Sequence, residues 1–204
     1  PDDAESYDAE AIDGSTLGDL RAREETVSIR ACDLYAGRQQ QYIGAAIEQL
    51  EARAGDSVDR YFVSAGFGVV DEDEELPPYN VTFNDYPASE IRKRASKLGI
   101  EEDLLALLDE EYDLVFLALG SEYYRTFDLS TVLGSVSSDT WVVCFNCASE
   151  AAAFDNAVAL PARTEQAKQQ ETIVVALKGK YLQNFADHRS HGAQVISPED
   201  LETY

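Results

Sequence analysis

The sequence has little positive charge. Its 204 residues hold 16 Lys plus Arg against 39 Asp plus Glu, a formal net charge of −23. Tight, non-specific binding to nucleic acid or to an anionic membrane needs clustered cations, so this balance disfavours both classes of partner. Lys is the scarcer cation and the acids are spread along the whole chain, which is typical of proteins adapted to molar salt. We interpret the charge as a halophilic adaptation; an ordinary acidic protein with a basic partner is the alternative.

Long apolar runs and cysteines are also scarce. No run approaches the ~20 residues that a membrane span needs, and no basic segment followed by an apolar one opens the sequence as a secretory signal would. Three cysteines in such a chain indicate a reducing, cytoplasmic location. Cys144 and Cys147 form a C-x-x-C pair, for which a redox role and, with His188 and His191, a metal role stay open. We favour a structural role and expect no bound metal.

The apolar patterns predict an α/β fold. Strands alternate with helices, which indicates a single domain with a largely parallel mixed sheet flanked by helices. Residues 1–25 are polar and acidic and are predicted to be a mobile or loosely docked extension, with the domain at 26–204. Residues 172–177 fit either a strand or the start of a helix that reaches Asp187. Predicted strands lie at 26–31, 60–64, 113–119, 140–145, 157–160 and 194–196, and predicted helices at 39–54, 87–98, 101–110 and 163–170.

Two segments fall where parallel sheets carry their functional loops, beyond the carboxyl ends of strands. They are residues 64–68 running on to 77–83, and residues 120–125. Glycine lets the backbone turn tightly or approach a ligand, and the neutral polar groups beside it suit a nucleobase or sugar edge. The alternative is that the glycines only shape a turn, with Tyr79 and Phe83 packed underneath. The predicted ligand-binding residues are Ser64, Gly66, Gly68, Tyr79, Asn80, Thr82, Gly120, Ser121 and Tyr123.

Two further features are candidates for chemistry. Glu122 follows a predicted strand and is a candidate acid/base, although a carboxylate is also favoured in the first turn of a helix. The stretch 178–191 is the most basic part of the chain. Its Lys178, Lys180 and Arg189 suit weak contact with nucleic-acid phosphate, and a plain surface helix is the alternative.

Three short segments resemble the YaaA-like family. Residues 62–70 (FVSAGFGVV) followed by 77–83 (PPYNVTF) resemble the family's strand, small-residue turn and downstream Pro-Tyr. Residues 117–124 (LALGSEYY) resemble a second family segment, and residues 33–37 (DLYAG) resemble the D-L-Y segment of its shorter branch. One departure stands out: residues 27–32 abut the D-L-Y directly, where the branch usually has a Cys-Ser or Cys-Gly turn.

The resemblance implies a cytosolic protein with a mixed α/β core and no obligatory cofactor. It also implies a role in nucleic-acid or oxidative-stress metabolism, because the family is associated with peroxide protection, with limiting free iron and with DNA binding. The leading hypothesis is that the strand-end loops form a cleft for a nucleotide or nucleobase-like ligand. A nucleoside N-glycosidase or glycosyl transferase that uses Glu122, and a non-catalytic interaction module, are the alternatives. Enzymatic activity and oligomeric state stay open.

Overall fold

The structure is a computed structural model, which describes residues 6–23, 26–194 and 200. Tertiary contacts divide the chain into two compact units. Unit 1 comprises residues 1–36, 60–104 and 120–128, and unit 2 comprises residues 37–59, 105–119 and 129–204. The sequence pattern indicated a boundary only after residue 25. The division emerges from contacts between stretches that are far apart along the chain.

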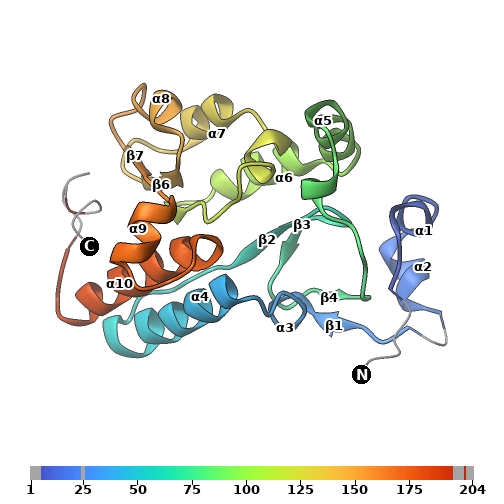
Figure 1. The fold of residues 1–204 in the computed structure, drawn as a ribbon, viewed down its shortest axis with the longest axis horizontal. Coiled ribbons are helices and arrows are strands. Elements are labelled where there is room, and N and C mark those ends of the chain that lie inside the picture. The colour runs from blue at the N-terminus through green and yellow to red at the C-terminus, as the bar shows by residue number, and fades with distance from the viewer. Residues whose placement is uncertain (1–5, 24–25, 195–199, 201–204) are drawn as a thin grey trace. The chain divides into compact units, whose positions relative to one another are not determined.

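Unit 1 combines short helices with two pairs of strands (Figure 1). Its elements are α1 (Ala9–Asp13), α2 (Leu17–Arg21), β1 (Ile29–Arg30), α3 (Ala31–Leu34), β2 (Tyr61–Ser64), β3 (Gly68–Asp71), β4 (Glu75–Leu76), η2 (Phe83–Asp85), α5 (Ala88–Lys97) and η3 (Tyr123–Thr126). β1 pairs with β4 and β2 pairs with β3, both antiparallel. Phe62, Val70 and Leu76 are buried together at their core.

The tight turn between β2 and β3 depends on Gly68. Its φ of 81° lies in the left-handed region, where a Cβ is strained. A Cβ at this position would also lie 2.9 Å from the carbonyl oxygen of Leu98. Ser64 pairs with Gly68 in the register of the hairpin, so the turn holds Ser64 at a defined place.

The described part of the acidic N-terminal region, residues 6–23, packs against the rest of unit 1. The backbone N–H of Tyr7 donates to the carbonyl of Pro78, and the N–H of Asn80 donates to the carbonyl of Tyr7, both at 2.9 Å. Ile12 and Leu20 are buried, so each short helix contributes an apolar residue to the contact. The segment is held by backbone hydrogen bonds and by apolar burial together.

Unit 2 is built around a three-stranded parallel sheet in the order β5-β6-β7. Its elements are α4 (Arg38–Gln49), η1 (Leu50–Ala54), β5 (Leu114–Phe116), α7 (Leu129–Ser135), β6 (Trp141–Phe145), α8 (Ala148–Ala151), β7 (Ala157–Leu160), α9 (Thr164–Gln169), η4 (Val174–Ala176) and α10 (Leu177–Ser190). The remaining helix, α6 (Ile100–Leu108), has residues in both units. α4 and α10 pack side by side (Figure 1), and their apolar faces share a core with the sheet.

The mixed helix and strand content agrees with the predicted α/β class, whereas a largely parallel sheet is not confirmed. Parallel pairing among the described residues is confined to the β5-β6-β7 sheet and to one bridge between Tyr7 and Tyr79. The reason lies in the connections, because β2 and β3 are joined by only three residues. A parallel pair needs a crossover of a dozen residues or more. The three-residue link between β2 and β3 therefore imposes an antiparallel hairpin.

Residues 172–177 take the helical alternative. η4 and α10 cover the range from Val174 onward, so the strand prediction there was wrong. Ile173, Val174 and Val175 are exposed, so this β-branched run is not the buried strand that its composition suggested. The predicted strand at 194–196 falls mostly outside the described residues.

Candidate functional site

Three hydroxyl groups from separate parts of the sequence meet in unit 1. Ser64 ends β2, Tyr79 lies in the loop after β4, and Tyr35 follows α3. The Oγ of Ser64 lies 2.8 Å from the hydroxyl of Tyr79, which is hydrogen-bonded in turn to the hydroxyl of Tyr35. We call these three residues the hydroxyl cluster. Two of its members, Ser64 and Tyr79, were predicted site residues, and the structure joins them directly.

The backbone sets the polarity of the hydroxyl cluster. Ser64 Oγ accepts hydrogen bonds from the N–H groups of Gly66 and Phe67, both at 3.1 Å. A hydroxyl oxygen has two lone pairs and one proton. Because both lone pairs are engaged, Ser64 donates its proton to Tyr79. The two internal bonds use two of the three hydroxyl protons, so one tyrosine O–H remains to donate to a further acceptor.

Aromatic packing holds the cluster in place. The ring of Tyr35 stacks on that of Phe62 with centroids 4.7 Å apart, and the ring of Tyr79 lies edge-on to Phe67 at 5.1 Å. A Cβ added to Gly66 would lie 3.0 Å from the ring of Tyr79. The absence of a side chain at Gly66 thus lets the turn rest on Tyr79. This contact agrees with the packing part of the alternative for Tyr79, and the ligand-binding role of Tyr79 stays a prediction.

Burial keeps both tyrosines of the cluster neutral. It is the main cause that raises the pKa of Tyr35, and the neighbouring Tyr79 adds to the effect. Burial also raises the pKa of Tyr79, although hydrogen bonds with Ser64 and Tyr35 and the positive charge of Arg94 oppose it. Both hydroxyls therefore keep their protons at physiological pH. The cluster presents hydrogen-bond donors and acceptors that carry no charge.

The second predicted segment, residues 120–125, also lies in this part of unit 1. The ring of Tyr123 lies edge-on to Phe83 with centroids 5.3 Å apart, and η3 packs against α5. Tyr123 lies near enough to both Tyr35 and Tyr79 to add to the rise in the pKa of each. Ser64, Tyr79 and Tyr123, which come from the two predicted segments, therefore belong to one neighbourhood.

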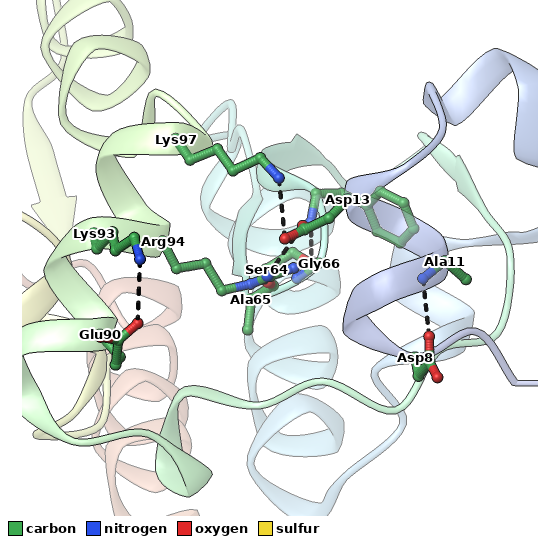
Figure 2. Close-up of polar contacts among 11 residues, drawn as sticks. Asp8, Ala11, Asp13, Ser64, Ala65, Gly66, Glu90, Lys93, Arg94 and Lys97 are labelled. Atoms are coloured by element: carbon green, nitrogen blue, oxygen red, sulfur yellow. Dashed lines mark hydrogen bonds and ion pairs between the residues drawn. The ribbon is translucent and has the colours of Figure 1, made fainter.

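A buried arginine lies against the same turn. Arg94 of α5 is only 8% exposed and extends toward residues 64–66, as Figure 2 shows. Its Nε donates to the carbonyl of Ala65 at 2.5 Å, and its Nη1 lies 3.1 Å from Asp13 Oδ1. Its Nη2 is buried and has no hydrogen-bond partner in the described part of the chain. The site therefore contains a cation that sequence reasoning did not select.

Two residues of this neighbourhood were missed although the sequence held a signal for each. Tyr35 stands in the D-L-Y segment on which the family resemblance partly rests, yet it was not chosen as a site residue. Arg94 lies between Ile91 and Ala95, three and one residues away, on the buried face of α5. A charged residue on an apolar helix face is rarely buried without a partner. The position of Arg94 on that face therefore indicated that it has a polar partner in the folded protein.

The other predicted ligand residues have more local roles. Asn80 is exposed, and its backbone N–H pairs with Tyr7. Thr82 Oγ1 accepts from the N–H of Asn84 at 3.3 Å and caps η2. The carbonyl of Gly120 accepts from the N–H of Tyr123 at 3.0 Å, which shapes the turn into η3, and Ser121 is exposed.

Glu122, the candidate acid/base, forms a local ion pair. Its Oε2 lies 3.0 Å from Nε of Arg125, three residues along the same turn. Both side chains are partly exposed, so water screens the pair. The contact accounts for the carboxylate as part of a surface turn, and the catalytic role stays a prediction.

The basic stretch of unit 2 lies on α10, and its cations have intramolecular contacts. Arg189 forms an ion pair with Asp56 through its Nε at 3.2 Å and its Nη2 at 2.5 Å. Lys180 donates to Gln183 at 2.9 Å. Lys178 is half-buried with its Nζ 5.9 Å from the centre of the Phe145 ring, and burial lowers its pKa. Phosphate contact through this stretch stays a prediction.

The C-x-x-C pair forms a disulfide at the end of β6. Cys144 and Cys147 are joined, both are buried, and Cys32 is free. His188 and His191 each bond to a backbone carbonyl four residues earlier. Within residues 6–23, 26–194 and 200, no group of three or more His, Cys, Asp or Glu side chains is arranged to hold a metal ion. The structure therefore shows the pair as a covalent link, and a redox role stays a hypothesis.

Comparisons with protein-family models, curated proteins and solved structures find no match to this chain. The resemblance to the YaaA-like family therefore rests on the sequence segments alone and stays a prediction. Within the described residues, every helix is too short or too polar to cross a membrane.

Proposed function

We propose that unit 1 binds a nucleobase, nucleoside or nucleotide at the hydroxyl cluster. The observation that carries the proposal is the convergence of Tyr35, Ser64 and Tyr79, from three segments far apart in sequence, on one chain of hydrogen bonds. Ser64 is buried while the two tyrosines are half-buried, so the chain of hydroxyls runs from the interior toward accessible side chains.

The chemistry of the cluster supports an uncharged polar ligand group. A nucleobase edge presents donors and acceptors in a fixed pattern, and aromatic side chains commonly bind its flat face. The cluster has one hydroxyl proton to donate and lone pairs to accept, and Phe67 and Tyr123 supply rings beside it. A carboxylate or ammonium group would be the preferred partner of a charged site, and these hydroxyls are neutral.

The proposal is for binding and not for catalysis. The carboxylate of Glu122 forms an ion pair with Arg125, and the hydroxyl cluster itself contains no carboxylate. The wider role, in cytosolic nucleic-acid or oxidative-stress metabolism, follows from the family resemblance and is part of the proposal. The part of the proposal that rests on geometry is that the neutral hydroxyl cluster recognises a base.

The test is a titration of uncharged nucleosides and free bases against the full chain, at low salt and at molar potassium chloride. We expect saturable binding, and we expect Tyr79→Phe to weaken it about tenfold, because the lost hydroxyl connects Ser64 to Tyr35. The matched control is Tyr181→Phe, whose hydroxyl donates to the carbonyl of Pro161 in unit 2. Binding of no base or nucleoside, or equal affinities for both variants, would refute the proposal.

A further inference from the structure

Asp13, the last residue of α1, bridges two cations of α5. Its Oδ1 lies 3.1 Å from Arg94 Nη1 and its Oδ2 lies 3.0 Å from Lys97 Nζ (Figure 2). A helix dipole disfavours a carboxylate at the C-terminal end of a helix. The dipole of α1 therefore does not stabilise the Asp13 carboxylate. The ion pairs with Arg94 and Lys97 stabilise it instead.

The carboxylate of Asp13 is ionised at neutral pH. Burial acts to raise its pKa, but a hydrogen bond from Lys97 and the charges of Arg94 and Lys97 outweigh it, so that the pKa is lowered. Asp13 therefore places a negative charge between the two cations. The chain as a whole has a net charge of −23, but at this point two positive side chains surround a single negative one.

Asp13 leaves part of Arg94 unsatisfied. The guanidinium has five N–H donors in a planar fork, and its two terminal nitrogens share one edge. Nη1 binds Asp13 while Nη2 is buried and has no partner within the described residues. A buried charged donor without an acceptor is destabilising, and it calls for a physical explanation.

Donor nitrogens outnumber acceptor oxygens at this contact. Arg94 Nη1, Arg94 Nη2 and Lys97 Nζ are three donor nitrogens, whereas a carboxylate offers two oxygens, and those of Asp13 take one nitrogen each. A terminal phosphate offers three oxygens, and it binds the terminal edge of an arginine through two of them. A phosphate in the place of the Asp13 carboxylate could therefore engage all three nitrogens.

We propose that Arg94 and Lys97 form an anion subsite for the phosphate group of a ligand, and that Asp13 occupies it as an internal competitor. The inference deepens the proposed function and rests on it, since the phosphate would belong to a nucleotide whose base contacts the hydroxyl cluster. The two parts are physically connected, because Arg94 donates to the carbonyl of Ala65, the residue after Ser64. The positive charge of Arg94 also acts to lower the pKa of the Tyr79 hydroxyl.

The Asp13 carboxylate can leave while its segment stays docked. The side chain of Asp13 is 36% exposed, and that of Lys97 is 54% exposed. The segment is held elsewhere, through the backbone of Tyr7 and the buried side chains of Ile12 and Leu20. A rotation of one side chain thus exchanges the internal anion for an external one, without unfolding α1.

The test measures the affinity of inorganic phosphate for the full chain by calorimetry at neutral pH. Asp13→Asn removes the competing charge, and we expect phosphate to bind it about tenfold more tightly than it binds the wild type. The matched control is Asp8→Asn, which removes the same charge from the same segment. Asp8 caps α1 by accepting from the N–H of Ala11 at 2.9 Å, and Asn caps a helix equally well.

A second pair of variants identifies the cation. In the Asp13→Asn background, Lys97→Gln should weaken phosphate binding about tenfold. Lys93→Gln, which removes an exposed lysine from the same helix, should leave the affinity unchanged. Equal phosphate affinities for Asp13→Asn and Asp8→Asn, or for Lys97→Gln and Lys93→Gln, would overturn the subsite. Since phosphate carries no base and the nucleoside titration involves no phosphate, each proposal can fail without the other.

Discussion

Gly66 and Tyr79 lie in direct contact. A Cβ on Gly66 would be 3.0 Å from two carbons of the Tyr79 ring and 3.3 Å from Cδ1 of Ile12. The turn after β2, the loop after β4 and helix α1 therefore meet at one glycine. The Ser64 hydroxyl accepts from the N–H of Gly66, so the same turn also carries the hydroxyl cluster.

We expect Gly66→Ala to lower the free energy of unfolding by about 1–3 kcal/mol, as overpacking of a tight site does. Urea unfolding measures the change. Gly44→Ala is the matched control, because Gly44 lies within helix α4 and a Cβ there meets nothing within 4 Å. That variant should gain roughly 0.5–1 kcal/mol from helix propensity. A loss of stability in both variants, or in neither, would contradict the packing described for Gly66.

The hydroxyl cluster predicts unequal effects for its two tyrosines. Tyr79 bonds to two hydroxyls and Tyr35 to one, so Tyr79→Phe should destabilise the protein more than Tyr35→Phe. A buried partner left unsatisfied costs about 1–3 kcal/mol, and only Tyr79→Phe leaves two. Equilibrium unfolding of both variants, and of each combined with Ser64→Ala, would show whether the three act as one network. Additive effects would argue against it.

Alkaline pH should weaken the fold through the same residues. The pKa of Tyr35 is raised by burial above its ordinary value of 10.0, so the folded protein keeps a proton that the unfolded chain releases. The stabilising contribution is complete below pH 10 and is lost as the pH rises further. We expect the free energy of unfolding to fall with pH more steeply in the wild type than in Tyr35→Phe. Parallel slopes for the two proteins would exclude a raised pKa at Tyr35.

The net charge of −23 predicts a protein stabilised by salt. Self-repulsion among the acids opposes the compact state, and molar salt shortens the Debye length to about 3 Å. Thermal melts should shift to higher temperature as potassium chloride rises from low to molar concentration. Sucrose at matched water activity is the control, because it screens no charge. A melting temperature that does not depend on salt would contradict the halophilic interpretation.

Local structure was predictable where the pattern is strong. Ile91, Ala95 and Leu98 recur at helical spacing, and α5 ends at Lys97, one residue before Leu98. Gly99 follows with a φ of 67°, the left-handed conformation that commonly ends a helix. The predicted strand at 60–64 is β2, which begins at Tyr61. These elements depend on periodicity and turn chemistry, which act over a few residues.

Residues 172–177 show where such prediction stops. A β-branched run fits a buried strand or an exposed one equally well, and here the chain enters η4 and α10 instead. The packing of α10 against α4 decides the outcome, and α4 lies more than a hundred residues earlier in the chain. Sequence spacing does not report contacts of that range.

The sequence by itself determined the charge, the mixed α/β content and the candidacy of Ser64, Gly66, Tyr79 and Tyr123, because composition and turn-forming residues are local properties. Only the tertiary structure decided that Tyr35 completes the hydroxyl chain, that Arg94 lies buried beside it, and that Asp13 forms an ion pair with Arg94. The physical reason is that these contacts join residues 29 to 81 positions apart. Their geometry follows from how unit 1 closes on itself, which no short window of sequence contains.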